Sequence, residues 1–185
     1  MIGSMRAVIQ RVSSASVEVV DSTLRQSSLR LRSGQAVQTN SPQDGRVVGR
    51  IGRGLLVYLS VGRGDSDADA EFMAEKLAEL WIFEDGQGPS TSLRTGKMNR
   101  SIKDSGGEIL LVSNFTLHGD CRKGRRPGFA AAAEPMAAQR LYEMTANLIA
   151  KRGLNVAKGV FGAHMQVASV NDGPVTFLLD SSRLF

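Results

Sequence analysis

Residues 47–81, VVGRIGRGLLVYLSVGRGDSDADAEFMAEKLAELW, contain the change from strand to helix that sets the fold class. Val47–Ile51 and Leu55–Val61 are apolar runs of strand length, and the glycine-containing segment Gly52–Gly54 between them predicts a hairpin turn. From Asp65 the apolar residues recur at spacings of three and four, which predicts an amphipathic helix of about four turns. Its expected buried stripe is Ala70, Met73, Ala74, Leu77 and Trp81.

Strands and one further helix are predicted on both sides of this stretch. The helix begins near Pro135, a favourable first-turn residue, and stops near Gly153, with a buried side formed by Ala137, Leu141, Met144 and Leu148. We expect the first two strands to be separated at Ser13–Ala15 and the last two to be joined by a turn at Asn171–Pro174. The predicted strands are Met5–Val12, Ser16–Val20, Glu108–Val112, Asn155–Val160, Met165–Val170 and Val175–Asp180. Such strands with two main amphipathic helices indicate an α+β protein.

The bulk composition indicates one domain without a membrane span. A chain of 185 residues with 42% hydrophobic content can bury one core. Its longest apolar runs are far shorter than the roughly 20 residues that cross a bilayer. The start lacks the long apolar run of a secretion signal, and the one cysteine cannot form an internal disulfide, so we expect a cytoplasmic protein. Two histidines and one cysteine are too few for an ordinary zinc site, so we expect no metal.

Positive charge is concentrated in one short loop. The formal net charge is +5, which favours an anionic partner such as RNA. Within residues 122–127, glycine and proline shape a segment that can follow phosphates without the constraints of a helix or sheet. It carries four cationic side chains, Arg122, Lys123, Arg125 and Arg126. A solvated loop without a ligand is the alternative.

Residues 22–45 interrupt the pattern of strands and helices. They are rich in Ser, Gln and Arg and have few large apolar side chains, which predicts an extended or partly disordered insertion. Arg25, Arg30 and Arg32 could contact RNA, although a solvated loop is again the alternative. The domain is expected to span residues 5–185, with residues 1–4 as extra N-terminal residues.

Two familiar hydrolase patterns fit the chain poorly. Ser113 lacks the G-x-S-x-G elbow of serine hydrolases. His118 and Cys121 are neighbours in sequence, which is not the spatial arrangement that a Cys–His pair needs. A hydrolase that uses His118 and Cys121 is kept as an alternative hypothesis.

Several short segments together carry a family resemblance. They are MRAVIQRV from Met5, GRGLLV from Gly52, WIFED from Trp81, GKMN from Gly96, the basic loop, FGAHMQV from Phe161 and NDGPVT from Asn171. In this order they resemble the D-aminoacyl-tRNA deacylase family over nearly the whole chain. The family signature Ser-Gln-Phe-Thr is represented by Ser113-Asn114-Phe115-Thr116, in which Asn114 replaces the usual glutamine. The second signature, Gly-Pro, is matched without change by Gly173-Pro174.

The resemblance implies a compact β-barrel-like fold with packed helices and a homodimer whose active sites lie at the subunit interface. It also implies hydrolysis of the ester bond of D-aminoacyl-tRNA without a cofactor, as chiral proofreading in translation. Gly173-Pro174 would carry a cis peptide bond and insert into the partner's pocket, held by hydrogen bonds from Arg11. Phe161 and Met165 would wall the site, and the basic loop would bind the tRNA.

The implied chemistry requires no strong nucleophile, because an ester next to a protonated amine is already reactive. We expect backbone amides near Phe115 and Thr116 to stabilise the oxyanion, and the ribose 2′-hydroxyl to orient the attacking water. Covalent catalysis by Thr116 is the rival mechanism. Carbonyl groups of Gly173 and Pro174 would exclude L-isomers but not glycine, so glycyl-tRNA is a second expected substrate. The alternative function is a tRNA- or RNA-binding module that binds without turnover.

Overall fold

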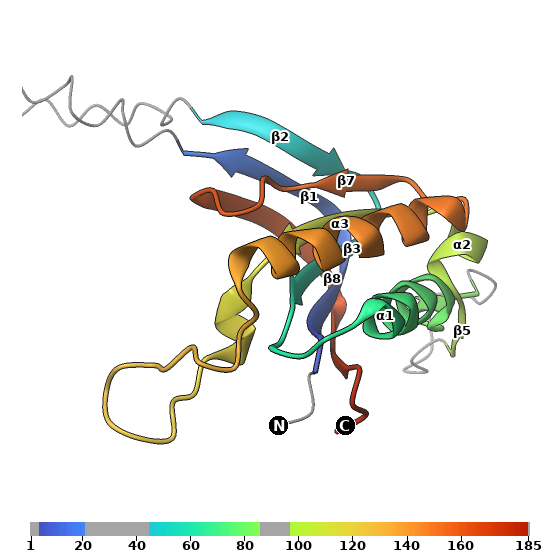
Figure 1. Ribbon diagram of the computed structural model, residues 1–185. Coiled ribbons are helices and arrows are strands. Elements are labelled where there is room, and N and C mark those ends of the chain that lie inside the picture. The colour runs from blue at the N-terminus through green and yellow to red at the C-terminus, as the bar shows by residue number, and fades with distance from the viewer. Residues whose placement is uncertain (1–3, 21–44, 86–96, 185) are drawn as a thin grey trace, which may run out of the picture.

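The computed structural model describes residues 4–20, 45–85 and 97–184, which form one curved sheet with helices packed on one face (Figure 1). The sheet has six strands in the order β2-β1-β3-β6-β7, with β8 also paired to β1, and β4 and β5 form a separate small sheet. In chain order the elements are β1 (Arg6–Val19), β2 (Arg46–Ile51), β3 (Gly54–Ser60), α1 (Asp67–Glu79), β4 (Phe83–Glu84), β5 (Met98–Arg100), α2 (Ile102–Ser105), β6 (Glu108–Ser113), the 3-10 helix η2 (Phe115–His118), α3 (Pro135–Lys151), β7 (Val156–Lys158) and β8 (Met165–Asp180). Most of the predicted insertion and residues 1–3 lie outside the described residues.

The sheet curves until its two end strands approach each other. Strands β2 and β7 stand at opposite ends of the strand order. Even so, a Cβ atom added at Gly49 of β2 would lie only 2.9 Å from the carbonyl oxygen of Lys158 in β7. Glycine permits this close backbone approach. The expected α+β class and barrel-like sheet are therefore confirmed.

Strand β1 is continuous, so the predicted break at Ser13–Ala15 is wrong. Ser14 and Ala15 pair with Val170 and Ser169 of β8. The register shifts on both sides of Val12 mark bulges, and a bulge lets a strand bend without ending. Small polar residues here occupy the bend of a long strand and not a turn between two strands.

Strands β2 and β3 do not pair with each other, so the predicted hairpin is also wrong. Both pair antiparallel with β1, β2 along Ala15–Val19 and β3 along Arg6–Val12. The turn at Gly52–Gly54 connects β2, which pairs with the second half of β1, to β3, which pairs with the first half. Apolar runs identified the strands, but the partner of each strand depends on distant residues.

Gly54, at the start of β3, has no room for a side chain. A Cβ atom there would lie 1.9 Å from the carbonyl oxygen of Glu108, its partner residue in β6. We expect Gly54→Ala to lower the free energy of unfolding by about 1–3 kcal/mol, as overpacking typically does. Chemical unfolding followed by circular dichroism measures the change. Gly52→Ala is the matched control, since its Cβ would approach only the Glu108 carboxylate, at 3.9 Å; equal stability of both variants would contradict the prediction.

Strand β8 is likewise continuous, so the predicted hairpin turn at Asn171–Pro174 is wrong. Residues on both sides of this motif pair with β1. The Gly173–Pro174 peptide bond is cis, as the resemblance implied. Gly173 has a φ of 129°, which favours glycine. The motif is therefore an irregularity inside a long strand, where the pairing with β1 shifts in register.

The two main helices form largely where the apolar spacing predicts them. Helix α1 buries most of its expected stripe, namely Ala70, Met73, Ala74 and Leu77. Trp81 lies beyond the end of α1 and is 65% exposed, so its predicted burial is wrong. In α3, Leu141 is buried and Met144 and Leu148 pack partly buried against the core, but Ala137 is exposed, so its predicted burial is wrong. Within the described ranges, no helix has the length and apolar character needed to cross a membrane.

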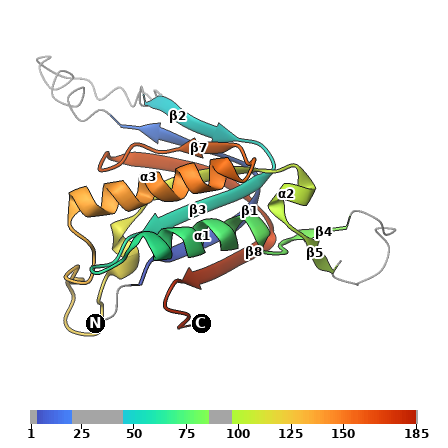
Figure 2. The same ribbon diagram turned by 45° about the vertical axis from the view of Figure 1, so that its right-hand side comes forward.

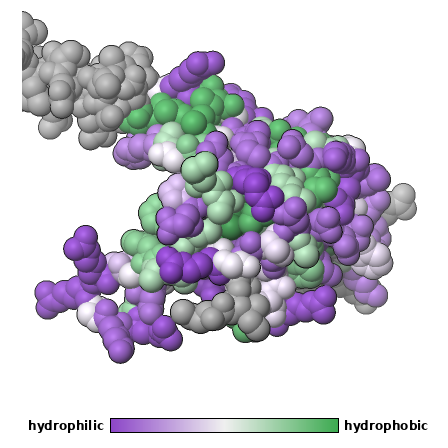
Figure 3. Space-filling model, viewed as in Figure 1, coloured by the Kyte–Doolittle hydropathy of each residue, from purple (hydrophilic) through white to green (hydrophobic). Residues whose placement is uncertain are grey.

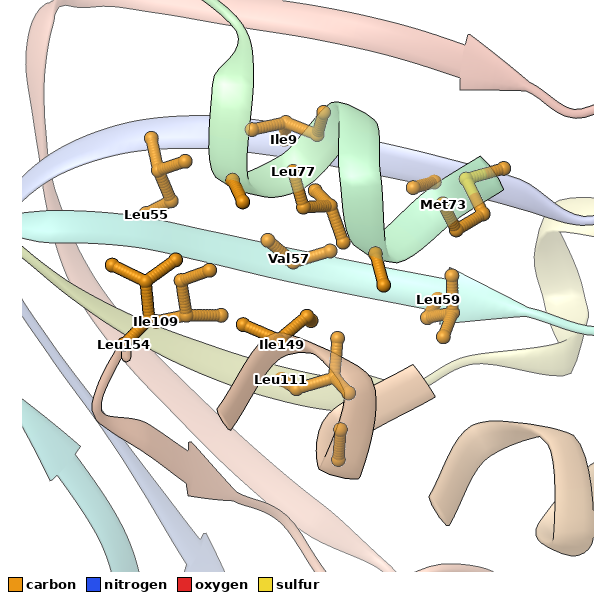
Figure 4. Packing of buried hydrophobic residues seen from close by; sticks show 14 of the residues in the cluster. Ile9, Leu55, Val57, Leu59, Met73, Leu77, Ile109, Leu111, Ile149 and Leu154 are labelled. Carbon is orange, nitrogen blue, oxygen red and sulfur yellow. The ribbon is translucent and has the colours of Figure 1, made fainter. Parts of the chain in front are cut away.

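The main hydrophobic core lies between the sheet and the two helices. Figure 4 shows Leu55, Val57 and Leu59 of β3 pointing toward side chains of α1 and α3. Helices α1 and α3 cover the same face of the sheet (Figures 1 and 2). A second core cluster, which contains Leu56 and Leu110, fills the concave side of the sheet. Because β3 is buried on both faces, packing fixes the position of its carboxyl end and of the residues that contact it.

Candidate active site

A pocket of about 830 Å³ opens where strands β3 and β6 end. These strands are parallel, and Leu59 is paired with Ser113 at their carboxyl ends. The pocket is bounded by η2, by the start of α3 and by residues 161–167. Its volume is within the range of small-molecule sites. Six of the expected site residues line it: Ser113, Asn114, Phe115, Thr116, Phe161 and Met165.

Asn114 caps the 3-10 helix that forms one wall of the pocket. Its backbone N–H donates to the carbonyl oxygen of Leu59 over 2.8 Å, which ties the segment to β3. Its side-chain Oδ1 accepts hydrogen bonds from the Thr116 N–H over 3.2 Å and from the Thr116 hydroxyl over 2.5 Å. An asparagine that accepts from the backbone two residues later is a typical helix cap. The Asn114 side chain, which is shorter than the glutamine of the family signature, thus forms its hydrogen bonds within its own segment.

This cap decides which groups of the segment can act on a substrate. The Thr116 N–H is occupied by Asn114, so it is not free to stabilise an oxyanion as the sequence analysis expected. The Thr116 hydroxyl donates to a neutral amide oxygen, which is not a base that could activate it as a nucleophile. Within the described part of the chain, the Phe115 N–H has no hydrogen-bond partner. Of the two expected amides, only that of Phe115 is available to a ligand.

Aromatic side chains frame the pocket. The rings of Phe115 and Phe129 meet edge to face with their centroids 5.1 Å apart, and the side chains are 59% and 40% exposed. Phe161 packs against the buried Tyr142 of α3, at 5.9 Å between ring centroids. Both Phe161 and Met165 line the pocket. Partly exposed aromatic surface of this kind is typical of ligand sites.

Arg11, Gly173 and Pro174 form a second group that does not line this pocket. The Arg11 guanidinium is buried, and it donates to the carbonyl oxygens of Ile82 over 2.9 Å and Asp172 over 3.2 Å. Its Nε also lies 3.3 Å from the Asp172 carboxylate. Arg11 therefore holds the strand immediately before Gly173. Gly173 and Pro174 themselves are exposed.

The four cationic residues of the basic loop are exposed, and the loop projects from the body of the molecule at the lower left of Figures 1 and 3. An antiparallel bridge between Asp120 and Gly128 closes its base. Arg122 forms an ion pair of 2.7 Å with Asp120 and holds the pKa of that carboxyl below its usual range. Lys123, Arg125 and Arg126 form no ion pair among the described residues. The loop presents at least three uncompensated positive charges to solvent.

The basic loop leads to a salt-dependence prediction. If the loop contacts phosphates, replacing Lys123, Arg125 and Arg126 by glutamine will weaken tRNA binding and reduce the slope of log K against log salt by about 0.7–0.9 per lost contact. The control replaces Asp120 by Asn and Arg122 by Gln together, because this removes an ion pair and leaves the net charge of the loop unchanged. Filter-binding titrations at several salt concentrations measure both effects. An unchanged slope in the triple variant would show that the loop is merely solvated.

A family model described as D-Tyr-tRNA(Tyr) deacylase matches residues 8–180 of the chain. The chain belongs to the D-Tyr-tRNA(Tyr) deacylase family. A D-aminoacyl-tRNA deacylase of Desulfitobacterium hafniense is 50% identical over 181 residues, which cover 98% of this chain and 100% of the relative. One from Thermotoga petrophila is 47% identical over the same shares of both chains.

Solved structures share the fold of this chain. The c-Myc DNA Unwinding Element Binding Protein is 33% identical with a TM-score of 0.72, and the match covers 94% of this chain and 97% of that chain. A probable eukaryotic D-amino acid tRNA deacylase, at 18% identity and a TM-score of 0.70, shares the fold. This member of the D-Tyr-tRNA(Tyr) deacylase family therefore has the same fold as both solved structures over nearly its whole length.

Among the residues that line the pocket of this family member without having been predicted from the sequence, Tyr58 and Phe129 add two further aromatic side chains. Tyr58 of β3 reaches the pocket, and burial raises the pKa of its hydroxyl, so the group is a neutral donor at ordinary pH. The tyrosine interrupts an otherwise aliphatic run, which was the available signal. Phe129 lies two residues after the basic loop and had no such signal. By contrast, His118 and Cys121 do not form a pair: Cys121 is exposed, and both ring nitrogens of the buried His118 have other partners.

Proposed function

We propose that this chain hydrolyses the ester bond of D-aminoacyl-tRNA and releases the free D-amino acid and the tRNA. The observation that carries the proposal is the pocket beside η2. There the Phe115 N–H, which has no partner among the described residues, belongs to the segment that resembles a family signature. A second support is family membership over residues 8–180. The pocket volume of about 830 Å³ suits an aminoacylated adenosine. The proposed role is chiral proofreading during translation in the cytoplasm.

The proposed chemistry relies on positioned backbone groups. Water attacks the ester carbonyl, and the Phe115 N–H donates to the oxygen that becomes negatively charged. A positioned amide stabilises the transition state more than the ground state, which is what accelerates a reaction. The 2′-hydroxyl of the terminal ribose orients the water and relays a proton to the neighbouring 3′-oxygen. This oxygen leaves as a tRNA hydroxyl when its bond to the carbonyl carbon breaks. The Thr116 hydroxyl stays bonded to Asn114 and forms no covalent intermediate.

A substrate that lacks the 2′-hydroxyl tests this mechanism. We expect hydrolysis of D-aminoacyl-tRNA ending in 2′-deoxyadenosine to be slower by roughly a hundredfold, comparable with losing one positioned hydrogen bond in an active site. Release of labelled amino acid is measured with and without enzyme. The enzyme-free rate corrects for the effect of the 2′-hydroxyl on the ester itself. An undiminished enzymatic rate would exclude the 2′-hydroxyl from the mechanism.

The proposed active unit is a homodimer in which Gly173-Pro174 of one subunit enters the pocket of its partner. The proposal is supported by the separation of this motif from the pocket within one chain. Strand β8 pairs only with β1 among the described strands, so its other edge is open to a partner. It also exposes large apolar side chains: Val170 at 58%, Leu178 at 59% and Phe177 at 37%. Exposed apolar surface beside an open strand edge is typical of a protein interface.

Chiral selection follows from the position that Gly173-Pro174 would take in the partner's pocket. Carbonyl oxygens of Gly173 and Pro174 would face the α-carbon of the bound aminoacyl group. An L side chain would collide with them, whereas a D side chain would point away and make no specific contact. Tolerance for many D-amino acids is the consequence. Glycine has no side chain to exclude, so glycyl-tRNA is a second proposed substrate.

The test of the proposed function uses one tRNA charged with the D- or the L-form of the same amino acid. We expect release of the D-amino acid at least about a hundredfold faster than that of the L-form, a selectivity that steric exclusion can supply. Equal rates would refute chiral selection. Binding of tRNA without turnover would favour the RNA-binding alternative. Loss of activity on thiol alkylation, without loss of tRNA binding, would favour a mechanism through Cys121.

A further inference from the structure

His118, the last residue of η2, makes two buried hydrogen bonds that the proposed mechanism does not use. The side chain is 4% exposed. Its Nδ1 lies 2.6 Å from the hydroxyl of Ser60 at the end of β3. Its Nε2 lies 2.8 Å from the backbone carbonyl oxygen of Ser4. The imidazole therefore links η2 to two separate parts of the chain.

These partners fix the protonation of the ring. A carbonyl oxygen can only accept, so Nε2 must carry a proton and donate to Ser4. In the neutral ring Nδ1 then has no proton and accepts from the Ser60 hydroxyl. Protonation of Nδ1 would place two donors against each other until the buried Ser60 hydroxyl turned away. The observed arrangement thus favours neutral His118.

The remaining contacts of η2 show why this end of the helix matters. At the other end Asn114 holds Thr116. Between the two ends, the Leu117 carbonyl oxygen accepts from the Arg6 guanidinium over 3.2 Å. Phe115 lies only three residues before His118, within a single turn of 3-10 helix. A shift of the imidazole therefore moves the turn that carries the Phe115 N–H.

We propose that neutral His118 is a positioning residue that fixes η2, and with it the Phe115 N–H, through its bonds to Ser60 and Ser4, and that protonation of the ring loosens this arrangement and lowers the rate. The inference rests on the proposed function, because it assigns a task to the Phe115 amide. His118 contacts no substrate and acts only through η2. The Ser4 carbonyl is part of the arrangement, so the residue before the predicted domain start contributes to the site.

Burial of the His118 ring sets the direction of the pH effect, against the hydrogen bond to Ser4, which raises the pKa. Burial lowers the pKa of His118, the Arg6 guanidinium of β1 lowers it further, and the Asp180 carboxylate of β8 raises it. The pKa of His118 is thus lower in the folded than in the unfolded protein. The neutral ring therefore contributes its full stability above the unfolded pKa. This stability is lost as the pH falls through the folded pKa. Asp65, whose carboxylate accepts from the Gly62 N–H near the ring, has a pKa raised to about 6, chiefly by burial. The titration of Asp65 must therefore be distinguished from that of His118 in any pH experiment.

The kinetic test compares variants that retain one of the two bonds. His118→Gln can place an amide N–H near the Nε2 position, His118→Asn can place an acceptor near Nδ1, and His118→Ala retains neither. We expect His118→Ala to lower kcat by roughly ten- to a hundredfold, the range for a small displacement of a site group, with little change in KM. The two amide variants should recover part of the rate. Ser60→Ala should lower kcat in the same way and serves if His118→Ala fails to fold.

The pH profile separates positioning from a purely structural role. Wild-type kcat should fall on the acid side, and this limb should be absent in folded His118→Gln but present in Asp65→Asn. The substrate amine titrates equally in all variants. Wild-type kcat in both His118→Ala and Ser60→Ala would overturn the proposal. An acid limb that persists in His118→Gln and disappears in Asp65→Asn would overturn it as well.

A spectroscopic measurement keeps the inference independent of activity. In ¹⁵N-labelled protein, His118 should show a protonated Nε2 near neutral pH, and the backbone amides of residues 115–117 should shift with the same midpoint as its ring. Failure of these amides to follow the ring would overturn the positioning role even in an active enzyme. If the amides follow the ring but D-aminoacyl-tRNA is not cleaved, the proposed function fails while the mechanical coupling stands.

Discussion

Phe115→Pro is expected to reduce kcat on D-aminoacyl-tRNA by about a hundredfold or more, the usual effect of removing one oxyanion donor. Proline lacks the backbone N–H that we assign to the oxyanion. The substitution is tolerable locally, because Phe115 is the first residue of η2 and Asn114 before it has φ −148° and ψ 86°. A first helical turn accepts proline, and Asn114 lies outside the α region that a following proline disfavours. Single-turnover hydrolysis measures the chemical step directly.

Phe115→Ala is the matched control for this substitution. It removes the same ring, including its contact with Phe129, but retains the N–H. We expect the alanine variant to lose affinity for the substrate while retaining most of kcat. Similar kcat values for the alanine and proline variants would assign the effect to the ring and remove the Phe115 amide from the mechanism.

Gly173→Ala is the second substitution with a large expected effect. An added Cβ atom would lie 2.7 Å from Val175 Cγ2 and 2.9 Å from the Val175 nitrogen, at a φ that disfavours a side chain. It would also lie 3.2 Å from the Arg11 guanidinium, which holds the preceding residue. The motif must therefore move, and a displacement of about 1 Å can lower an enzymatic rate by roughly a hundredfold. Rates on D- and L-charged tRNA measure both activity and discrimination.

The control for Gly173→Ala is a glycine with a comparable backbone but an open environment. Gly153 at the end of α3 has a φ of 85°, and an added Cβ atom would meet nothing within 4 Å. Gly153→Ala should lose some stability but keep both rates. Pro174→Ala should impair the site as Gly173→Ala does. Unaltered rates on both isomers in the two motif variants would exclude Gly173-Pro174 from the site.

The sequence predicted the elements of the fold better than their connections. Apolar spacing located α1 and α3, since a helical stripe depends on residues three and four apart. Two of the turns expected from small and polar residues, at Ser13–Ala15 and Asn171–Pro174, instead lie inside β1 and β8. Each of these strands continues because the other is hydrogen-bonded beside it across the interruption. Such long-range pairing has no local signature.

The site was predictable in its residues but not in its hydrogen bonds. The family resemblance pointed to Ser113–Thr116, which line the pocket. It did not reveal that Asn114 takes up both polar groups of Thr116, because that depends on the geometry of one turn. The partners of His118 come from Ser4 and Ser60, far away in sequence. Their role could be inferred only once the fold had brought them together.

The most direct test of the central claim, an active site built from two subunits, is complementation between Phe115→Pro and Gly173→Ala. Each variant alone is expected to be nearly inactive. A heterodimer obtained by co-expression with two affinity tags would contain one doubly damaged site and one site with an intact Phe115 and an intact Gly173. We predict that it recovers about half of the wild-type kcat per dimer, since one of two symmetric sites is restored. A heterodimer as inactive as its parents would contradict the account.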